Sequence, residues 1–185
     1  MLPFGVRRTF ASLIAMRETT PFYRVHVAEN DGQQIFGPES LFDIDCGDRF
    51  DWPSSEPAKP GKIKGKMYGW LDGNCSSPFI STEIKDRIRP LVGSCVQWHG
   101  PFDVCGRAYV FLNCVNVIDC ALPGSNNNLL FIDGQAVGES HLFRIKGRAP
   151  RLFCSQAFRD NCVISGDTGV RFGRIKEDGW EEFPF

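Results

Sequence analysis

Alternating apolar and polar positions predict strands near both ends of the chain. Between Phe22 and Val27, one tyrosine and two valines occupy alternate positions, which is the period of a half-buried strand. A turn signal at Glu29–Gly32 follows, after which residues 33–36 are expected to return as a second strand. His141–Ile145 alternates in the same way, and Val170–Ile175 is the last strand that the pattern predicts.

The middle of the chain predicts a hairpin with a buried second strand. Val96–Val104 and Arg107–Val117 are expected to pair around Cys105–Gly106. The second run is apolar on both faces, which is typical of a strand inside a sheet, and Asn113 is its one polar interruption. Arg151–Cys154 predicts one more strand.

A short helix is predicted over Thr82–Arg89. Isoleucine recurs every four residues across this stretch, which makes one face apolar, and Ser81 stands at the N-cap position. Glu83 is placed to pair with Arg87 one turn further on. Pro90 is expected to end the helix, because proline has no backbone N–H to donate.

A second helix is expected to follow Ser155, which is a suitable capping residue. Phe158 and Cys162 would then share one face of that helix. The strands outnumber the helices and do not alternate with them regularly. The expected fold class is therefore α+β, with a mixed, mainly antiparallel sheet and two or three short flanking helices in a single domain.

The 185 residues are expected to divide into an N-terminal extension, residues 1–20, and one domain, residues 21–185. A chain of this length is large enough to bury one hydrophobic core. Met16 is an alternative to Met1 as the functional start, since the first strong strand pattern begins only after it. Residues 1–15 are accordingly expected to be dispensable for the fold.

Composition and charge narrow the classes of function. Lys and Arg number 21 against 22 Asp and Glu, a formal charge of -1, so the chain lacks the overall basic field usual for nucleic-acid or anionic-membrane binding. No apolar run approaches the roughly 18 residues of a membrane-spanning helix. Neither a membrane nor a nucleic acid is an expected partner, and a cytoplasmic location is expected.

The eight cysteines do not form a metal or redox motif. None stands in the C-x-x-C spacing that structural zinc sites and redox motifs use, and no metal or cofactor is expected. Several lie inside apolar runs, where a thiol behaves as a small hydrophobic side chain. We therefore expect reduced core thiols rather than disulfides.

A long surface loop, residues 37–65, contains the expected partner-binding segment, and its Pro- and Lys-rich part spans residues 53–66. Four aspartates here surround two aromatic residues, and an aromatic anchor ringed by charge combines affinity with electrostatic steering. In the alternative, the carboxylates only solvate the loop while the two rings pack back onto the core. The predicted partner-binding residues are Asp43, Asp45, Asp48, Phe50, Asp51 and Trp52.

Two other groups of residues have simpler explanations than a functional site. Asn113, Asn116 and Asp119 carry the oxygen ligands that a hard cation takes, but after an apolar strand such side chains more often bond backbone groups, so a structural role is expected. Gly61–Lys66 lacks the strand-to-helix context of a phosphate loop. No catalytic residue is assigned, because no Ser or Cys stands in a nucleophile-elbow context.

Two alternative functions stay open. A small enzyme would use a Cys/His site between Trp98 and Cys105. A nucleic-acid adaptor would use the basic patch from Arg144 to Arg151, which has aromatic residues close by. Alternation places Arg144 and Lys146 on the solvent side of a strand, where solubility is the simpler explanation.

Five segments, taken in order, resemble one protein family. Three are short motifs, namely a strand ending in Leu-Asn-x-x-Asn-x-x-Asp at Leu112–Asp119, Phe-Arg-x-Lys-Gly at Phe143–Gly147, and Thr-Gly-x-x-Phe at Thr168–Phe172. A serine-capped helix precedes them, and Leu152–Ser155 opens a second helix. Over residues 81–175 the chain resembles the myxobacterial-type immunity protein domain of bacterial polymorphic toxin systems.

The resemblance implies a cytoplasmic binding protein, with no catalysis of its own, that is encoded beside a toxin and protects the producing cell. It would neutralise its cognate toxin by direct occlusion. Basic nucleases are among the toxins whose clefts attract acidic inhibitors. The first 80 residues match the family only as an initial strand, so the resemblance does not identify the toxin.

Overall fold

The computed structural model describes seven stretches of the chain. The predicted N-terminal extension, residues 1–20, and both candidate starts lie outside the described residues, as does Gly61–Lys66. The described stretches are residues 21–27, 34–36, 47–53, 58–60, 67–73, 77–148 and 151–183.

The elements follow the chain in a largely β order. The strands are β1 (Phe22–Val27), β2 (Gln34–Phe36), β3 (Lys59–Pro60), β4 (Trp70–Gly73), β5 (Phe79–Ser81), β6 (Val96–Val104), β7 (Arg107–Cys114), β8 (Val117–Ile118), β9 (Leu142–Ile145), β10 (Leu152–Ser155), β11 (Val170–Ile175) and β12 (Glu181–Glu182). The helices are α1 (Thr82–Val92), α2 (Gly134–Val137) and α3 (Gln156–Ile164), with a 3-10 turn, η3 (Gly93–Cys95), after α1. The predicted strands and both predicted helices are present.

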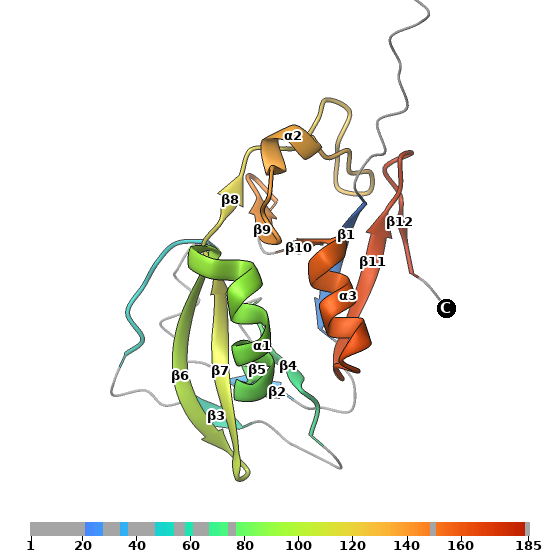
Figure 1. Cartoon of the computed structure of the whole chain (residues 1–185). Helices are drawn as coiled ribbons and strands as arrows, with labels where there is room; N and C mark the ends of the chain where they lie inside the picture. The colour runs from blue at the N-terminus through green and yellow to red at the C-terminus, as the bar shows by residue number, and fades with distance from the viewer. Residues whose placement is uncertain are drawn as a thin grey trace, which may run out of the picture.

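The strands form two sheets (Figure 1). The terminal sheet has the order β12-β11-β1-β10-β9-β8, and the hairpin sheet has the order β3-β2-β4-β5-β7-β6. Neighbours are antiparallel except for the pairs β8–β9 and β2–β4. The predicted α+β class and mainly antiparallel pairing are thus confirmed. The predicted strand Arg107–Val117 is divided, because β7 ends at Cys114 and Val117 begins β8, which pairs with β9 in the terminal sheet. The chain thus changes sheet after β1 and again after β7.

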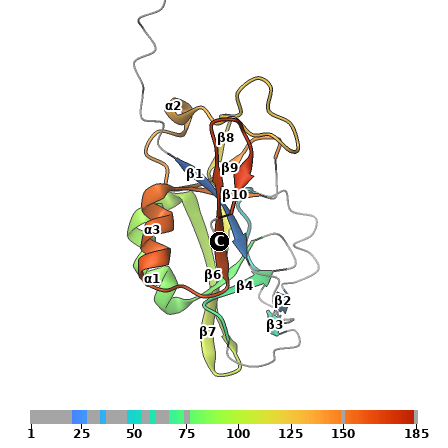
Figure 2. The ribbon, with the colours of Figure 1, turned by 90° about the vertical axis from the view of Figure 1, so that its right-hand side faces the viewer.

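Both long helices cover one side of the molecule. Figure 2 shows α1 and α3 together on the same side of the strands. The largest apolar cluster takes Ile84 and Ile88 from α1, Phe158 from α3, Leu112 from β7 and Val25 from β1. One core therefore joins the two sheets beneath the helices. None of the described helices is long and apolar enough to cross a bilayer.

The first helix extends further than its sequence predicts. It passes through Pro90 and ends at Val92, which is 1% exposed. A proline this close to the C-terminal end removes one hydrogen bond, and the burial of Val92 offsets that loss. Ser81 stands at the N-cap with extended dihedrals, but its side chain makes no capping hydrogen bond. In α3 the predicted cap is confirmed, because Ser155 accepts a hydrogen bond from the Phe158 N–H.

The described cysteines are all free thiols, and most are buried. Cys114, Cys120, Cys154 and Cys162 lie in the core, while Cys105 is exposed in the turn between β6 and β7. Burial raises the pKa of Cys114 and of Cys120 to about 11 and also raises the pKa of Cys154 and Cys162. Cys46 and Cys75 lie outside the described residues.

We predict that a thiol reagent modifies Cys105 rapidly in the native protein and the four buried thiols only after denaturation. The thiolate is the reactive form, and these four sites disfavour it as well as excluding the reagent. A Cys105→Ser variant should lower the amplitude of the fast phase by one thiol, with the reaction followed by absorbance in the presence and absence of urea. Equal reactivity of all thiols in native protein, or the presence of disulfides, would contradict this assignment.

Candidate functional site

Residues 47–53, here called the strap, cross the hairpin sheet on the face away from α1. Gln97 and Asn113 are directly opposite each other on β6 and β7, and both point at the strap. The Asn113 amide donates to the Asp48 carbonyl at 2.7 Å. The Gln97 amide donates to the Phe50 carbonyl at 2.6 Å and accepts from the Phe50 N–H at 3.1 Å. Asn113 therefore interrupts the apolar strand in order to hold this segment.

The two aromatic rings of the strap pack onto the sheet. Phe50 stacks on His99 with ring centroids 4.4 Å apart, and Trp52 lies 4.6 Å from Phe102 and 5.4 Å from Phe111. Both rings are half-buried against a compact apolar cluster. That cluster contains Ala58, Leu71, Phe79, Val104, Tyr109 and Phe111. The rings thus help to cover the sheet while part of their surface faces solvent.

The strap brings together four of the six predicted partner-binding residues. Asp48 and Asp51 are exposed, while Phe50 and Trp52 lie between them and the sheet. Asp43 and Asp45 lie outside the described residues. Arg49 is the one basic residue of the strap, and its guanidinium donates to the Ser94 carbonyl at 3.3 Å. The exposed side of the strap is therefore mainly acidic and is held by side chains of a regular sheet.

His99 lies beneath the strap and has an unusual environment. The residue is 9% exposed, and its Nε2 is buried without a hydrogen-bond partner among the described residues. Burial lowers the pKa of His99, and the nearby Asp51 charge opposes this shift only in part. The imidazole is therefore neutral near pH 7. The position of His99 on a strand was predictable from the sequence. Its burial was not, because that burial depends on the packing of the strap.

The structure does not bring His99 together with Cys105. Cys105 is exposed in the hairpin turn, with φ of 53°, whereas His99 faces the aromatic rings of the strap. A strand advances about 3.3 Å per residue, so six positions along β6 and its turn separate the two backbones by up to about 20 Å. The Cys/His arrangement that a small enzyme would need is thus not formed by this pair.

Arg144 is buried, which corrects the expectation that it faces solvent. It is 1% exposed, and its guanidinium donates to the Cys114 carbonyl at 3.1 Å and to the Ser77 hydroxyl at 2.7 Å. Every residue of β9 is buried, because apolar clusters cover both faces of this part of the terminal sheet. The Arg144 side chain consequently lies between the two sheets.

The remaining residues of the basic patch also have structural contacts. Arg148 donates to the Asn126 carbonyl, and Arg151 donates to the Asn127 carbonyl at 3.3 Å. Lys146 is exposed and pairs with Asp119 at 3.4 Å. Among the described residues of this patch, Arg144 is thus buried and Lys146 is paired with an acidic residue, which leaves Arg148 and Arg151 for the surface that a nucleic-acid adaptor would use.

Each motif of the resemblance makes hydrogen bonds that link segments of the two sheets. The Asn116 amide donates to the Leu142 carbonyl at 3.2 Å, and the Arg144 N–H donates to the Asn116 carbonyl at 2.8 Å. Asn113 and Asn116 thus bond backbone groups, as expected for a structural role. The third motif is used similarly, because Thr168 accepts from the Gly69 N–H through its hydroxyl at 3.0 Å and from the Trp70 N–H through its carbonyl at 2.9 Å.

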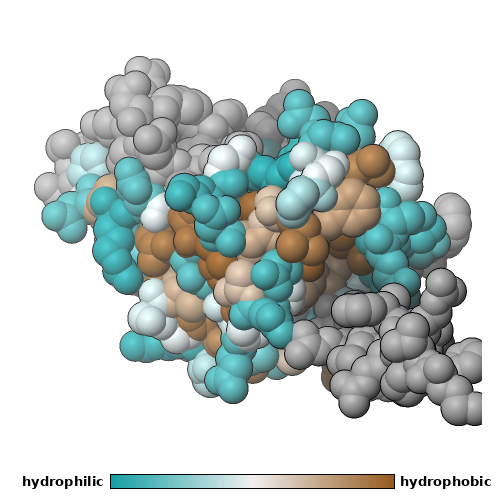
Figure 3. All heavy atoms as spheres, turned by 90° about the horizontal axis from the view of Figure 1, so that it is seen from above, coloured by the Kyte–Doolittle hydropathy of each residue, from teal (hydrophilic) through white to brown (hydrophobic). Residues whose placement is uncertain are grey.

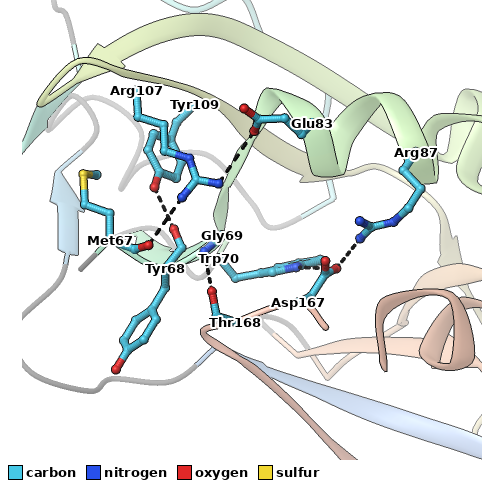
Figure 4. Close-up of polar contacts among 10 residues, drawn as sticks. All are labelled: Met67, Tyr68, Gly69, Trp70, Glu83, Arg87, Arg107, Tyr109, Asp167 and Thr168. Carbon is cyan, nitrogen blue, oxygen red and sulfur yellow. Dashed lines mark hydrogen bonds and ion pairs between the residues drawn. The ribbon is translucent and has the colours of Figure 1, made fainter. Parts of the chain in front are cut away.

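Figure 4 shows the charged part of this junction. Arg87 donates to Asp167 at 2.5 Å and to Asn161 at 3.0 Å, and the Trp70 indole N–H lies 3.3 Å from the same Asp167 carboxylate. The predicted pairing of Glu83 with Arg87 is wrong. Glu83 lies 3.7 Å from Arg107 instead, because Arg87 turns toward the chain that follows α3.

Apolar side chains are also exposed at the end of the molecule that carries α2. Figure 3 shows this end, with apolar side chains surrounded by polar ones. Leu122 is 42% exposed and Trp180 is 55% exposed. Backbone hydrogen bonds link the segments that carry these two residues. The Leu122 N–H donates to the Phe131 carbonyl, and the Leu130 N–H donates to the Gly179 carbonyl. No buried, unpartnered polar group has been identified here among the described residues, in contrast to the site beneath the strap.

No protein-family model matches the chain, and neither does any curated protein sequence. The resemblance to the immunity domain therefore stays a prediction that rests on the motifs named above.

Proposed function

We propose that the chain is an immunity-type binding protein that neutralises a cognate bacterial toxin by direct occlusion. The observation that carries the proposal is the strap, where exposed carboxylates and half-buried aromatic rings are fixed on a regular sheet by the Gln97 and Asn113 amides. Pre-organised aromatic residues surrounded by charge are typical of protein interfaces.

The separation between structural motif residues and an exposed strap supports the same function. The motif residues Asn113, Asn116, Arg144 and Thr168 are occupied in holding the sheets and the strap together. Their side chains make hydrogen bonds within the chain, as expected of residues that form a scaffold. The exposed strap then carries the specificity, and it lies in the part of the chain that the resemblance does not cover.

The mechanism needs no chemistry on this chain. An interface of standard size buries about 1,600 Å², which is sufficient to cover the active cleft of a toxin. Exposed Asp48 and Asp51 would attract a basic partner and accelerate its approach. A basic nuclease is the class of toxin that fits this charge, and Trp52 and Phe50 would supply the apolar contact.

We predict that the double variant Asp48→Lys, Asp51→Lys lowers the association rate with the toxin encoded by the neighbouring gene by about tenfold at low salt, with a smaller effect at high salt. Trp52→Ala is expected to cost more than about 1 kcal/mol in affinity. Surface plasmon resonance at two salt concentrations measures both effects.

The matched control is Asp86→Lys, Glu182→Lys, which changes the net charge equally. Asp86 is exposed on α1, across the sheet from the strap, and Glu182 is exposed on β12 of the other sheet. This control should alter the association rate less than about twofold. If the control and strap variants slow association equally, only net charge matters and the binding surface is elsewhere.

A further inference from the structure

The buried Nε2 of His99 is a group for which no described residue of the free protein provides a partner. Its residue is 9% exposed, and no described residue donates to this atom or accepts from it. Leaving a buried polar group unsatisfied has a free-energy cost, and native proteins keep few such groups. A phenylalanine at this position would pack on Phe50 without that cost, so the imidazole calls for a functional explanation.

The groups around His99 share one chemical preference. The Phe50 ring lies 4.4 Å away and the Trp52 ring lies 5.7 Å away, measured between centroids. The Asp51 carboxylate is near enough to act on the imidazole electrostatically. Aromatic faces, a carboxylate and a neutral imidazole nitrogen that accepts a hydrogen bond all favour a cation that carries N–H donors.

We propose that the strap and His99 form the recognition site for a lysine or arginine side chain of the protein partner. The cationic group donates a hydrogen bond to His99 Nε2, pairs with Asp51 and lies against the Trp52 ring. This inference rests on the proposed function, because it names what the toxin presents to the strap.

Access of the cation to the imidazole requires a local movement of the strap, since Nε2 is covered in the free protein. Phe50 is held by its stack on His99 and by the two hydrogen bonds to the Gln97 amide. Surface segments can open locally at a lower free energy than the core. Binding thus requires a local shift of the otherwise pre-organised strap, and the new hydrogen bond to His99 replaces contacts that are lost.

The key variant is His99→Phe, which removes the nitrogen and keeps a flat ring. We expect its thermal midpoint to rise by about 2 to 8 °C, because an unsatisfied buried group disappears. Its affinity for the toxin is expected to fall at least tenfold. His99→Gln restores an acceptor and should recover part of that affinity. A purely structural His99 would change stability without this opposite change in binding.

A second measurement uses the protein without the toxin. Acetyl-octalysine amide is titrated into the wild-type chain and into His99→Phe and Asp51→Asn, with binding followed by NMR of the strap amides and, in the wild type, of the His99 ring. We expect the wild-type His99 signal to move and the affinity to be at least fivefold lower in each variant. Acetyl-octaglutamate amide, the control peptide, should leave the signal unchanged.

The outcomes separate the two proposals. If His99→Phe binds both toxin and octalysine as tightly as the wild type, the inference is overturned while the proposed function stands. If octalysine binds as expected but the wild-type chain does not bind the toxin, the proposed function fails and the cation site is supported. If spermidine moves the His99 signal as strongly as the peptide at equal charge, the assignment to a protein side chain is overturned.

Discussion

A Gly169→Ala variant is expected to lose about 3 kcal/mol of unfolding free energy. Gly169 has φ of 83°, and a Cβ there would stand 2.1 Å from the Trp70 carbonyl oxygen and 2.8 Å from Tyr68 Cβ. Positive φ costs a non-glycine residue about 1 to 2 kcal/mol, and overpacking against backbone adds about 1 to 3 kcal/mol. Urea denaturation followed by tryptophan fluorescence measures the loss.

Gly166→Ala is the matched control for this prediction. Gly166 also has positive φ, of 69°, but nothing lies within 4 Å of the position that an alanine methyl group would take, so only the backbone cost of about 1 kcal/mol applies. The difference between the two variants isolates the close approach of residues 168–169 to β4. Equal losses in both variants would show that Gly169 does not approach β4 closely.

Phe143→Ala and Leu112→Ala are each expected to lose roughly 2 to 5 kcal/mol of unfolding free energy. Both side chains are 0% exposed, Leu112 in the core beneath the helices and Phe143 in the cluster on the other face of the terminal sheet. Truncation removes apolar contacts and leaves a cavity in each case. Chemical denaturation measures both variants against the wild type.

Ile164→Ala provides the comparison for these two variants. Ile164 is 86% exposed at the end of α3, so its truncation should change stability by less than about 0.5 kcal/mol. A loss below about 1 kcal/mol at Leu112 or Phe143 would show that one of the two clusters does not contribute to the cooperative core.

The local structure was largely predictable because alternation and capping are local signals. The pattern from Phe22 to Val27 is fixed by one buried face, and β1 has those bounds. The hairpin turn at Cys105–Gly106 and the Ser155 cap depend on neighbouring residues alone. Such features need no knowledge of the rest of the chain.

Arg144 and the split between sheets were not predictable in this way. Arginine in an alternating strand indicates a solvent-facing side chain, but here β7 of the other sheet supplies the Cys114 carbonyl and the segment before β5 supplies the Ser77 hydroxyl. These partners lie 30 and 67 residues away in the sequence. Arg87 likewise takes its partner from beyond α3 rather than from its own helix, because tertiary contacts override helix-local pairing.

The candidate site was predictable in its location and only partly in its geometry. The aspartates and aromatic residues of the strap mark an unusual segment, but the packing of Phe50 and Trp52 on the sheet depends on Gln97 and His99 of β6. The rings pack on the sheet, as in the alternative for this loop, while Asp48 and Asp51 are exposed, and partner binding by this segment stays a prediction. Asp43 and Asp45 stay predictions.

We propose that this chain neutralises a toxin by covering it, and stoichiometric inhibition tests that proposal most directly. The toxin encoded beside the gene is purified, and its activity is measured while the wild-type chain is added in increasing amounts. We predict that activity falls linearly to zero near one chain per toxin, with the complex visible by size-exclusion chromatography. Full toxin activity in the presence of excess chain, with no complex formed, would contradict the account.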